Sequence, residues 1–395
     1  MGVLISGASV AGPVVAYWLA RRGVDVTVVE RAPALRKSGG HAVDLFRPAM
    51  DIAERMGVLP DVLERETGTA HMTLHSPGAR PVDLDLRRFF GTLSDRHVEI
   101  MRDDLSEVFH NATRDDVEYV FDDSITSISP DGEVTFEHGA PRRFDVVVGA
   151  DGLHSNVRRL VFGDVPEHFI GAYLAVQSLP RDFGRDNHTT CHVRPGKMAA
   201  IYTANHLADA RAVFLFRSEQ LDYHYRDTDR QKQLLREAFA EMPEVAPWLD
   251  QDGTFYFDSI TQLRLDTWSR DRVTLVGDAA YCPGPAVGGS TSLAVVGAYV
   301  LANELAAHDN PTEAFAAYER EIGDYVRRSR EFALTAARRL LPRTNRAVWL
   351  LRNGSRLFTH LPPPVGRALM KLNGNSLRLH DEVEVKRYPD LAGKA

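Results

Sequence analysis

The sequence predicts an α/β protein in which a nucleotide-binding sheet is interrupted by a second sheet. Residues 2–30 have the order strand, glycine turn, helix and strand, which is a βαβ unit. Two further apolar runs, 144–148 and 272–276, are each followed by a glycine and are typical of strands buried on both faces. Between these runs, from 163 to 260, apolar and polar residues alternate, which indicates an inserted sheet.

The opening unit can be assigned element by element. Residues 3–5 form a short apolar strand, and the glycines of residues 7–12 predict a tight turn. The helix that follows is expected over 14–22, because Pro13 suits a first helical turn and Gly23 suits the end of a helix. Residues 25–30 are rich in β-branched side chains and predict the second strand.

The remaining elements follow from hydrophobic spacing. Helical spacing is found at 51–56, 102–112 and 229–241, and a further helix is expected from about residue 290. Three short apolar runs, 117–121, 125–128 and 134–136, predict a small antiparallel meander.

Composition excludes several classes of protein. The 395 residues are 44% hydrophobic and 26% charged, as in an ordinary globular protein, and the net charge of −7 argues against a nucleic-acid binder. Two cysteines, Cys191 and Cys282, are too few for a disulfide framework, and we expect a reducing, cytoplasmic location without a signal peptide. The longest apolar stretch, 292–305, is shorter than the about 20 residues that span a bilayer.

The turn after the first strand approximates a dinucleotide-binding fingerprint. Gly7, Ser9 and Gly12 occupy its three glycine positions, and a helix N-terminus there would present free N–H groups to phosphates. Glu30 ends the second strand, where an acid accepts hydrogen bonds from a ribose. The sequence therefore predicts a dinucleotide site, although this motif alone does not separate FAD from NAD.

Two later motifs indicate that the dinucleotide is FAD rather than NAD. Asp151-Gly152 follows one buried strand, and Gly277-Asp278 follows another, with Pro285-x-x-Gly288 after it. In this order they resemble the motifs of the FAD-dependent aromatic hydroxylases of the para-hydroxybenzoate hydroxylase type, nearest their small tetracycline-inactivating and polyketide-tailoring members. Ser290 and Ser292 depart from the family pattern, which has Gly and Asn there.

The resemblance implies a Rossmann-like FAD-binding domain with an inserted mixed-sheet substrate domain and a C-terminal helical segment. We expect the discontinuous FAD-binding domain to comprise residues 1–70, 98–165 and 262–335. The substrate domain would then comprise 71–97 and 166–261, and the helical segment 336–395. Residues 320–380 are strongly basic, which fits a helix packed on the acidic body or, alternatively, a surface that contacts membranes.

The resemblance also implies site residues. Asp278 is expected at the flavin ribitol, and the backbone around Pro285 and Gly288 near the isoalloxazine ring. Arg102, Asp44 and Arg31 match other FAD-contacting positions. For Asp151 we favour a cofactor-site role, but Asp151 and Arg158 could equally hold the sheet to its helix.

Substrate-binding residues are harder to predict. Gln177 lies near a position that lines the substrate cavity in the tetracycline-inactivating members, and Tyr202, Phe214 and Phe216 belong to the inserted sheet. Each aromatic residue could instead belong to the core. No metal site is expected, because His188 and His192 lie in a segment that favours a strand.

The resemblance implies a monooxygenase that holds FAD non-covalently and takes electrons from transient NADPH or NADH. O₂ would then form a flavin C4a-hydroperoxide that hydroxylates a phenolic, polyketide-like or tetracycline-like aromatic. The flavin carries this chemistry, and no catalytic side chain is assigned. A flavin reductase or dehydrogenase of the same superfamily, and a non-catalytic flavoprotein that sequesters a small molecule, are the alternatives. We expect no nucleic-acid or membrane partner, and a monomer or a homodimer.

Overall fold

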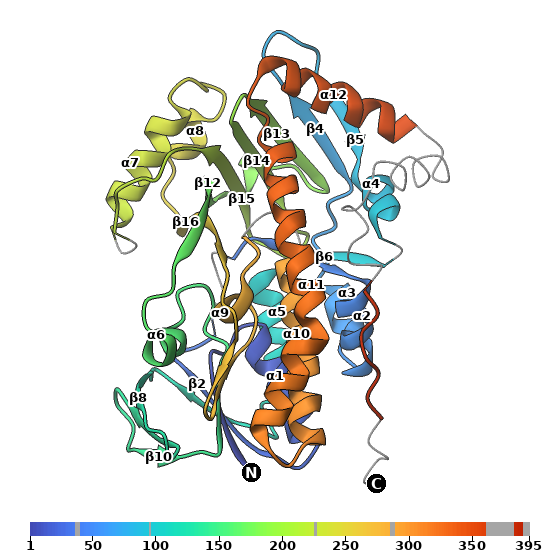
Figure 1. The fold of residues 1–395 in the computed structure, drawn as a ribbon. Coiled ribbons are helices and arrows are strands. Elements are labelled where there is room, and N and C mark those ends of the chain that lie inside the picture. Colours follow the sequence, from blue (N-terminus) through green and yellow to red (C-terminus); the bar gives the residue numbers. More distant parts are fainter. Residues whose placement is uncertain (36–39, 95, 225–226, 285–288, 361–382, 390–395) are drawn as a thin grey trace.

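The computed structural model describes the whole chain except residues 36–39, 95, 225–226, 285–288, 361–382 and 390–395. A six-stranded sheet lies at the end of the molecule where the chain begins, and a seven-stranded sheet lies beyond it (Figure 1). In spatial order the first sheet consists of β17 (Ser269–Arg270), β18 (Val273–Leu275), β11 (Val146–Gly149), β1 (Gly2–Ser6), β2 (Asp25–Glu30) and β7 (Glu118–Phe121).

Parallel pairing in the first sheet confirms the predicted nucleotide-binding architecture. From β18 to β7 every neighbouring pair is parallel, and only β17 runs antiparallel. The run 117–121 was expected in an antiparallel meander, and that was wrong: β7 extends the main sheet beside β2. The separate small sheet is β10 (Arg142–Arg143), β9 (Glu133–Phe136) and β8 (Ile125–Ile128).

The seven-stranded sheet contains the predicted insertion together with a segment from the N-terminal third. Its strands are β16 (Phe255–Leu263), β12 (Glu167–Pro180), β15 (Asp209–Arg217), β14 (Lys197–Thr203), β13 (His188–Arg194), β4 (His71–His75) and β5 (Val82–Asp85). A two-stranded ribbon, β3 (Ala42–Phe46) and β6 (His97–Met101), lies between the two sheets (Figure 1). The division into domains remains our proposal.

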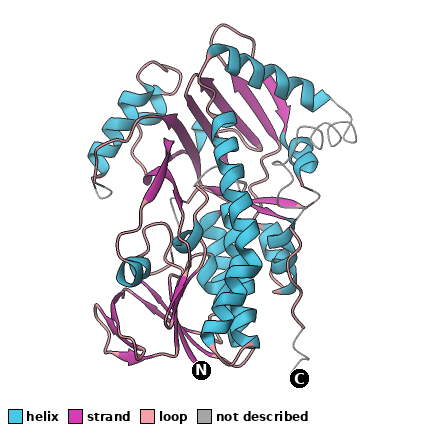
Figure 2. Cartoon of the chain, in the orientation of Figure 1, coloured by secondary structure: helices cyan, strands magenta, loops and turns pink. Residues whose placement is uncertain are grey.

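Helices occupy both ends of the molecule and the space between the sheets (Figure 2). They are α1 (Ala11–Ala20), α2 (Arg47–Arg55), α3 (Leu59–Glu64), α4 (Leu86–Leu93), α5 (Arg102–Asn111), α6 (Asn156–Phe162), α7 (Thr228–Phe239), α8 (Ala246–Leu249), α9 (Asp278–Tyr281), α10 (Ser290–Ala307), α11 (Pro311–Leu340) and α12 (Asn345–His360), with a 3₁₀ turn at Arg181–Phe183.

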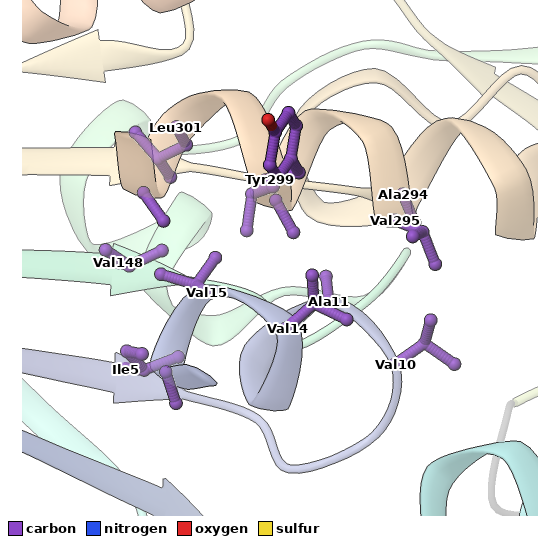
Figure 3. Close-up of a cluster of buried hydrophobic side chains, with 14 of the residues drawn as sticks. Ile5, Val10, Ala11, Val14, Val15, Val148, Ala294, Val295, Tyr299 and Leu301 are labelled. Carbon is purple, nitrogen blue, oxygen red and sulfur yellow. The ribbon is translucent and has the colours of Figure 1, made fainter. Parts of the chain in front are cut away.

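The main core lies between the six-stranded sheet and α10. Figure 3 shows Val14 and Val15 of α1 between the strand residues Ile5 and Val148 and the side chains of α10. α10 is long and apolar enough to cross a membrane, but it is mostly buried and packs against both α1 and α11. Its hydrophobicity is therefore that of a core helix.

The long helix α11 connects the two sheets. It packs along α10 and then continues beside the seven-stranded sheet (Figure 1). Arg217, at the end of β15, donates hydrogen bonds to the carbonyl oxygens of Leu341 and Ala337 at the end of this helix. The boundary expected between residues 335 and 336 falls inside α11.

Candidate functional site

The glycine turn has a backbone packing that only glycine permits. Gly7 has a φ of +109°, and a Cβ on it would lie 2.5 Å from the carbonyl oxygen of Ala150. A Cβ on Gly12 would lie 1.9 Å from the carbonyl oxygen of Gly7. Gly12 thus lets α1 pack closely on the end of β1, as predicted for the last glycine of the fingerprint.

Glu30 lies against this turn. Its carboxylate accepts hydrogen bonds from the backbone N–H groups of Ala8 and Ala32, each at 2.9 Å. The acid at the end of β2 and the turn at the end of β1 are therefore in one place. Arg31, the next residue, is exposed.

Arg102 and Asp278 converge on the same turn from distant segments. Arg102 begins α5, its backbone N–H donates to the carbonyl of His41, and its Nη2 lies 3.4 Å from the hydroxyl of Ser9. Asp278 begins α9. Burial raises the pKa of Asp278, and the nearby positive charge of Arg102 opposes that rise. Three motifs that are far apart in the sequence therefore share one site.

Asp44 lies on the ribbon beside this site. Its carboxylate is 2.7 Å from Nε2 of His97, and it stands directly opposite Glu99 in the β3–β6 pairing. Burial, together with the charge of Asp44, raises the pKa of Glu99 to about 7. Sequence reasoning missed Glu99, because no motif marks an acid on a short alternating strand.

The contacts of Asp151 are those of a helix cap. Its carboxylate accepts from the N–H groups of Asn156 and Val157 and from the hydroxyl of Ser155, at the start of α6. Arg158 donates to the carbonyl oxygens of Leu153 and Ala279. These bonds favour the structural alternative for both residues, and they connect the segment after β11 to α9.

A cluster of polar side chains, which the sequence analysis did not single out, extends from Arg102 towards the surface. The rings of His41 and Tyr256 are stacked 6.3 Å apart. The Tyr256 hydroxyl lies 3.1 Å from Asp258, whose same oxygen is 3.1 Å from Nε2 of His154. Sequence reasoning had no signal for this group, because its members come from three separate segments.

Burial sets the protonation states within this group. Burial and the charge of Arg102 lower the pKa of His41 to about 4, so its imidazole is neutral at pH 7. Burial and the charge of Asp258 raise the pKa of Tyr256, which keeps its hydroxyl protonated. Hydrogen bonding to Asp258 raises the pKa of His154, whose side chain is 57% exposed.

The predicted substrate residues lie on opposite faces of the seven-stranded sheet. Phe214 and Phe216 pack against Phe239 of α7, in the core beneath α7 and α8, so their placement in a substrate cavity was wrong. Gln177 lies on the same face of the sheet as Phe214, and it is 2% exposed and donates to the carbonyl of Gln251. The sequence-based alternative of core residues holds for Phe214 and Phe216.

Tyr202 lies on the other face of that sheet, beside the ribbon. Its hydroxyl accepts from the N–H of Ala42 at 2.8 Å, and it packs with Met101. Burial raises its pKa. Of the four predicted substrate residues, Tyr202 alone faces the half of the molecule that holds Arg102.

Pro285 and Gly288 lie outside the described residues. The helix that follows them begins after Gly289, which has a φ of +86°. Ser292, in its first turn, accepts from the N–H of Phe46 and donates to the carbonyl of Asp44. The N-terminus of α10 is therefore joined to the ribbon.

Metal binding has no support in the described part of the chain, where no group of three or more His, Cys, Asp or Glu side chains could hold an ion. His188 and His192 lie on β13, as their sequence context indicated.

Comparison with known proteins places these features in a family. Residues 1–333 match the family model described as the FAD binding domain. The chain is 43% identical to an uncharacterized protein of Mycobacterium tuberculosis over 83% of this chain and 91% of the relative. It is 36% identical to a flavin-dependent monooxygenase of Legionella longbeachae over 84% of this chain and 87% of the relative.

Solved structures agree with this assignment. Tetracycline destructase Tet(55) has a TM-score of 0.83 and 30% identity, with 98% of each chain covered. HpxO of Klebsiella pneumoniae, solved with FAD and uric acid, has a TM-score of 0.72 at 21% identity over 90% of this chain and 93% of that chain, which supports the fold.

Proposed function

This chain belongs to the FAD binding domain family and is an FAD-dependent monooxygenase, and on that premise we propose that it hydroxylates a phenolic, polyketide-like or tetracycline-like aromatic compound with electrons from NAD(P)H. The convergence of the glycine turn, Arg102 and Asp278 is the observation that carries this proposal. The likeness to a tetracycline destructase supports the substrate class.

The residues present fit FAD. A Cβ at Gly7 or Gly12 would clash with a neighbouring backbone carbonyl, so the turn needs both glycines. The first N–H groups of α1, which follow the turn, can receive the pyrophosphate. Glu30 is placed for a ribose, and Asp278 and Arg102 for the ribitol chain and the flavin side chain. The role of each residue remains our proposal.

When bound, the flavin supplies the redox and oxygen chemistry. The protein holds it and shapes its surroundings. The N-terminus of α10, joined to the ribbon through Ser292, carries a partial positive charge and would favour negative charge on a flavin ring held beside it. Neutral His41 and protonated Tyr256 form a wall without net charge beside Arg102.

Tyr202 is the residue we propose for the substrate side. The face of the seven-stranded sheet that carries Tyr202 also carries Arg211, which is 3% exposed, forms an ion pair with Asp209 and donates to the carbonyl of Gly40. An aromatic hydroxyl beside an ion-paired guanidinium on one face of the sheet suits the polar end of a phenolic substrate.

The reductant requires no second dinucleotide fold. The sequence has no second glycine fingerprint, so we propose that NAD(P)H binds transiently, reduces the flavin and leaves. We also propose a cytoplasmic location, which the buried free thiols of Cys191 and Cys282 support.

Stimulation of NAD(P)H oxidation by candidate substrates tests this function. The flavin-loaded protein would be assayed with a panel of phenols, polyketides and tetracyclines, and oxidation should accelerate with at least one class. Tyr202→Phe, which removes only the hydroxyl, should raise KM for that compound while FAD content stays unchanged. Equal NAD(P)H oxidation with every compound and with none would contradict the proposal.

A further inference from the structure

A pocket of about 900 Å³ lies at the end of α11, away from the glycine turn. Its walls come from the start of β12, the end of β15 and the last turns of α11, where that helix reaches the seven-stranded sheet (Figure 1). Pockets of roughly 300–1,000 Å³ accommodate small organic ligands.

Arginines dominate the lining. Arg217, Arg264, Arg338 and Arg343 line the pocket, and Glu219 is the one carboxylate among the described lining residues. Throughout the described ranges of the chain, no carboxylate lies within ion-pair distance of any of these four guanidinium groups. In a protein with a net charge of −7, this local excess of positive charge is not balanced by the fold.

Arg330 is a fifth cation close to Arg264, although it does not line the pocket. It precedes Leu334 by four residues and Arg338 by eight, so helical spacing puts all three on one side of α11. Its Nε and Nη2 are buried and find no hydrogen-bond partner among the described residues. Burial and the charge of Arg264 lower its pKa. Buried donors without a partner are costly, so these two call for an acceptor such as a water molecule or an anion.

Arg217 shows that the charges are held in place. Its guanidinium is fixed by the carbonyls of Leu341, at 2.8 Å, and Ala337, at 3.0 Å. Burial and the charges of Arg343 and Arg338 lower its pKa, which means that the positive potential of the three arginines adds up. Phe169, Ile170 and Leu334 give the pocket an apolar wall.

The pocket is joined to the cofactor side of the molecule by one buried residue. Nε2 of Gln262 donates to the carbonyls of Pro283 and Arg330, and its Oε1 accepts from Arg264. Pro283 follows α9, the helix that Asp278 begins. A ligand held by these arginines would therefore contact the same framework that holds the candidate flavin site.

We propose that this pocket binds a small organic molecule that carries phosphate or paired carboxylate groups. Guanidinium groups bind both anions in a bidentate manner, and the apolar wall would receive the body of the molecule. The anion could belong to the reductant or to another metabolite, such as an anionic aromatic. The proposal itself does not depend on the monooxygenase reaction.

Binding measured without turnover tests the pocket. The flavin-loaded protein would be titrated calorimetrically with inorganic pyrophosphate and with phthalate at constant ionic strength. Arg338→Ala/Arg343→Ala should weaken binding of at least one of them about tenfold or more, because charged hydrogen bonds are lost. Both side chains are exposed, so the fold should be retained.

Arg339→Ala/Arg346→Ala is the matched control. It removes the same charge from exposed positions of α11 and α12 that do not line this pocket, and affinity should change less than twofold. Equal weakening in both double variants, or no binding to the wild type, would overturn the proposal.

Steady-state kinetics distinguish the two possible sources of the anion, the reductant and another metabolite. If the reductant supplies it, the pocket variant raises KM for NADPH or NADH while kcat stays unchanged and the control does not. If KM is unchanged although pyrophosphate or phthalate binding is lost, the pocket serves another anion. A protein that binds these probes but never oxidises NAD(P)H would retain the pocket and contradict only the proposed reaction.

Discussion

Gly12 shows at the scale of one residue how the nucleotide site depends on backbone contact. A side chain there would meet the carbonyl oxygen of Gly7, which cannot move without displacing β1. We expect Gly12→Val to lose FAD and to lower the free energy of unfolding by about 1–3 kcal/mol, the usual cost of overpacking. FAD content after gel filtration and urea unfolding measure both effects.

Gly323→Ala is the control for that substitution. It lies within α11 with open space around its Cα, and alanine should stabilise the helix by about 0.5–1 kcal/mol. A Gly12→Val protein that holds FAD as the wild type does would contradict the placement of the turn.

Asp278 should matter for cofactor affinity. Asp278→Ala removes a charged acceptor, and the loss of such a hydrogen bond costs about 1.5–3 kcal/mol, or roughly ten- to a hundredfold in the Kd for FAD. Flavin fluorescence quenching during titration of apoprotein measures that Kd. Asp266→Ala, at an exposed position before β17, is the comparison, and an equal Kd in the two variants would refute the assignment.

Glu99 predicts a pH dependence of stability. Its pKa of about 7 lies above the value of 4.5 for an exposed glutamate, so the folded state binds the proton more tightly. The resulting stability is fully present below pH 4.5 and is lost as the pH rises through 7. Glu99→Gln, which keeps an acceptor for Thr67, should therefore gain stability relative to wild type by roughly 1–3 kcal/mol between pH 5 and pH 8.

Urea unfolding of the FAD-saturated proteins at the two pH values gives this difference. Asp44, which stands opposite Glu99, and His97, two residues before Glu99 on β6, stay in place in the variant, so only the Glu99 carboxyl group is removed. A constant difference between variant and wild type at pH 5 and pH 8 would show that Glu99 is ionised throughout this range.

At the scale of elements, the start of α6 decides whether Asp151 has a structural role or a cofactor-binding role. Asp151 accepts two N–H groups of its first turn. Asp151→Ala should therefore lower the free energy of unfolding by about 1–2 kcal/mol, the usual cost of a lost cap, while the Kd for FAD changes less than threefold. A larger change in Kd than in stability would restore the cofactor role that we favoured from the sequence.

Element positions were largely predictable, but strand partners were not. Apolar runs and glycines located β1, β2, β11 and β18, because strands buried on both faces have a distinctive composition. The run containing β7 was assigned to the wrong sheet, since a short apolar segment does not specify whether it pairs with its neighbours or with β2.

Face assignment failed for a related reason. Alternation on β15 separates Phe214 and Phe216 from Arg211, but α7 and α8 cover one side of the sheet while the other faces the ribbon, so both sides bury large residues. The alternation of residues along a strand does not by itself show which face of the sheet receives a ligand. Arg102 and Asp278 could be proposed from the sequence because each belongs to a motif, whereas Glu99, Tyr256 and Asp258 belong to none.

At the scale of the whole molecule, α11 connects the two sheets. It packs along α10, which contacts α1 behind the glycine turn, and its far end is held by Arg217 of the seven-stranded sheet. The candidate flavin site and the sheet that carries Tyr202 are thus held by one continuous helix. This arrangement fits a reaction in which cofactor and substrate must meet in a fixed geometry.

Oxygen transfer is the central claim, and labelling with ¹⁸O₂ tests it most directly. The flavin-loaded protein would react with NAD(P)H and the aromatic compound that most stimulates its oxidation, and the product would be analysed by mass spectrometry. We predict one ¹⁸O atom per hydroxylated product and none from H₂¹⁸O. Product that carries oxygen only from water, or turnover that continues without O₂, would contradict oxygen transfer and indicate a dehydrogenase.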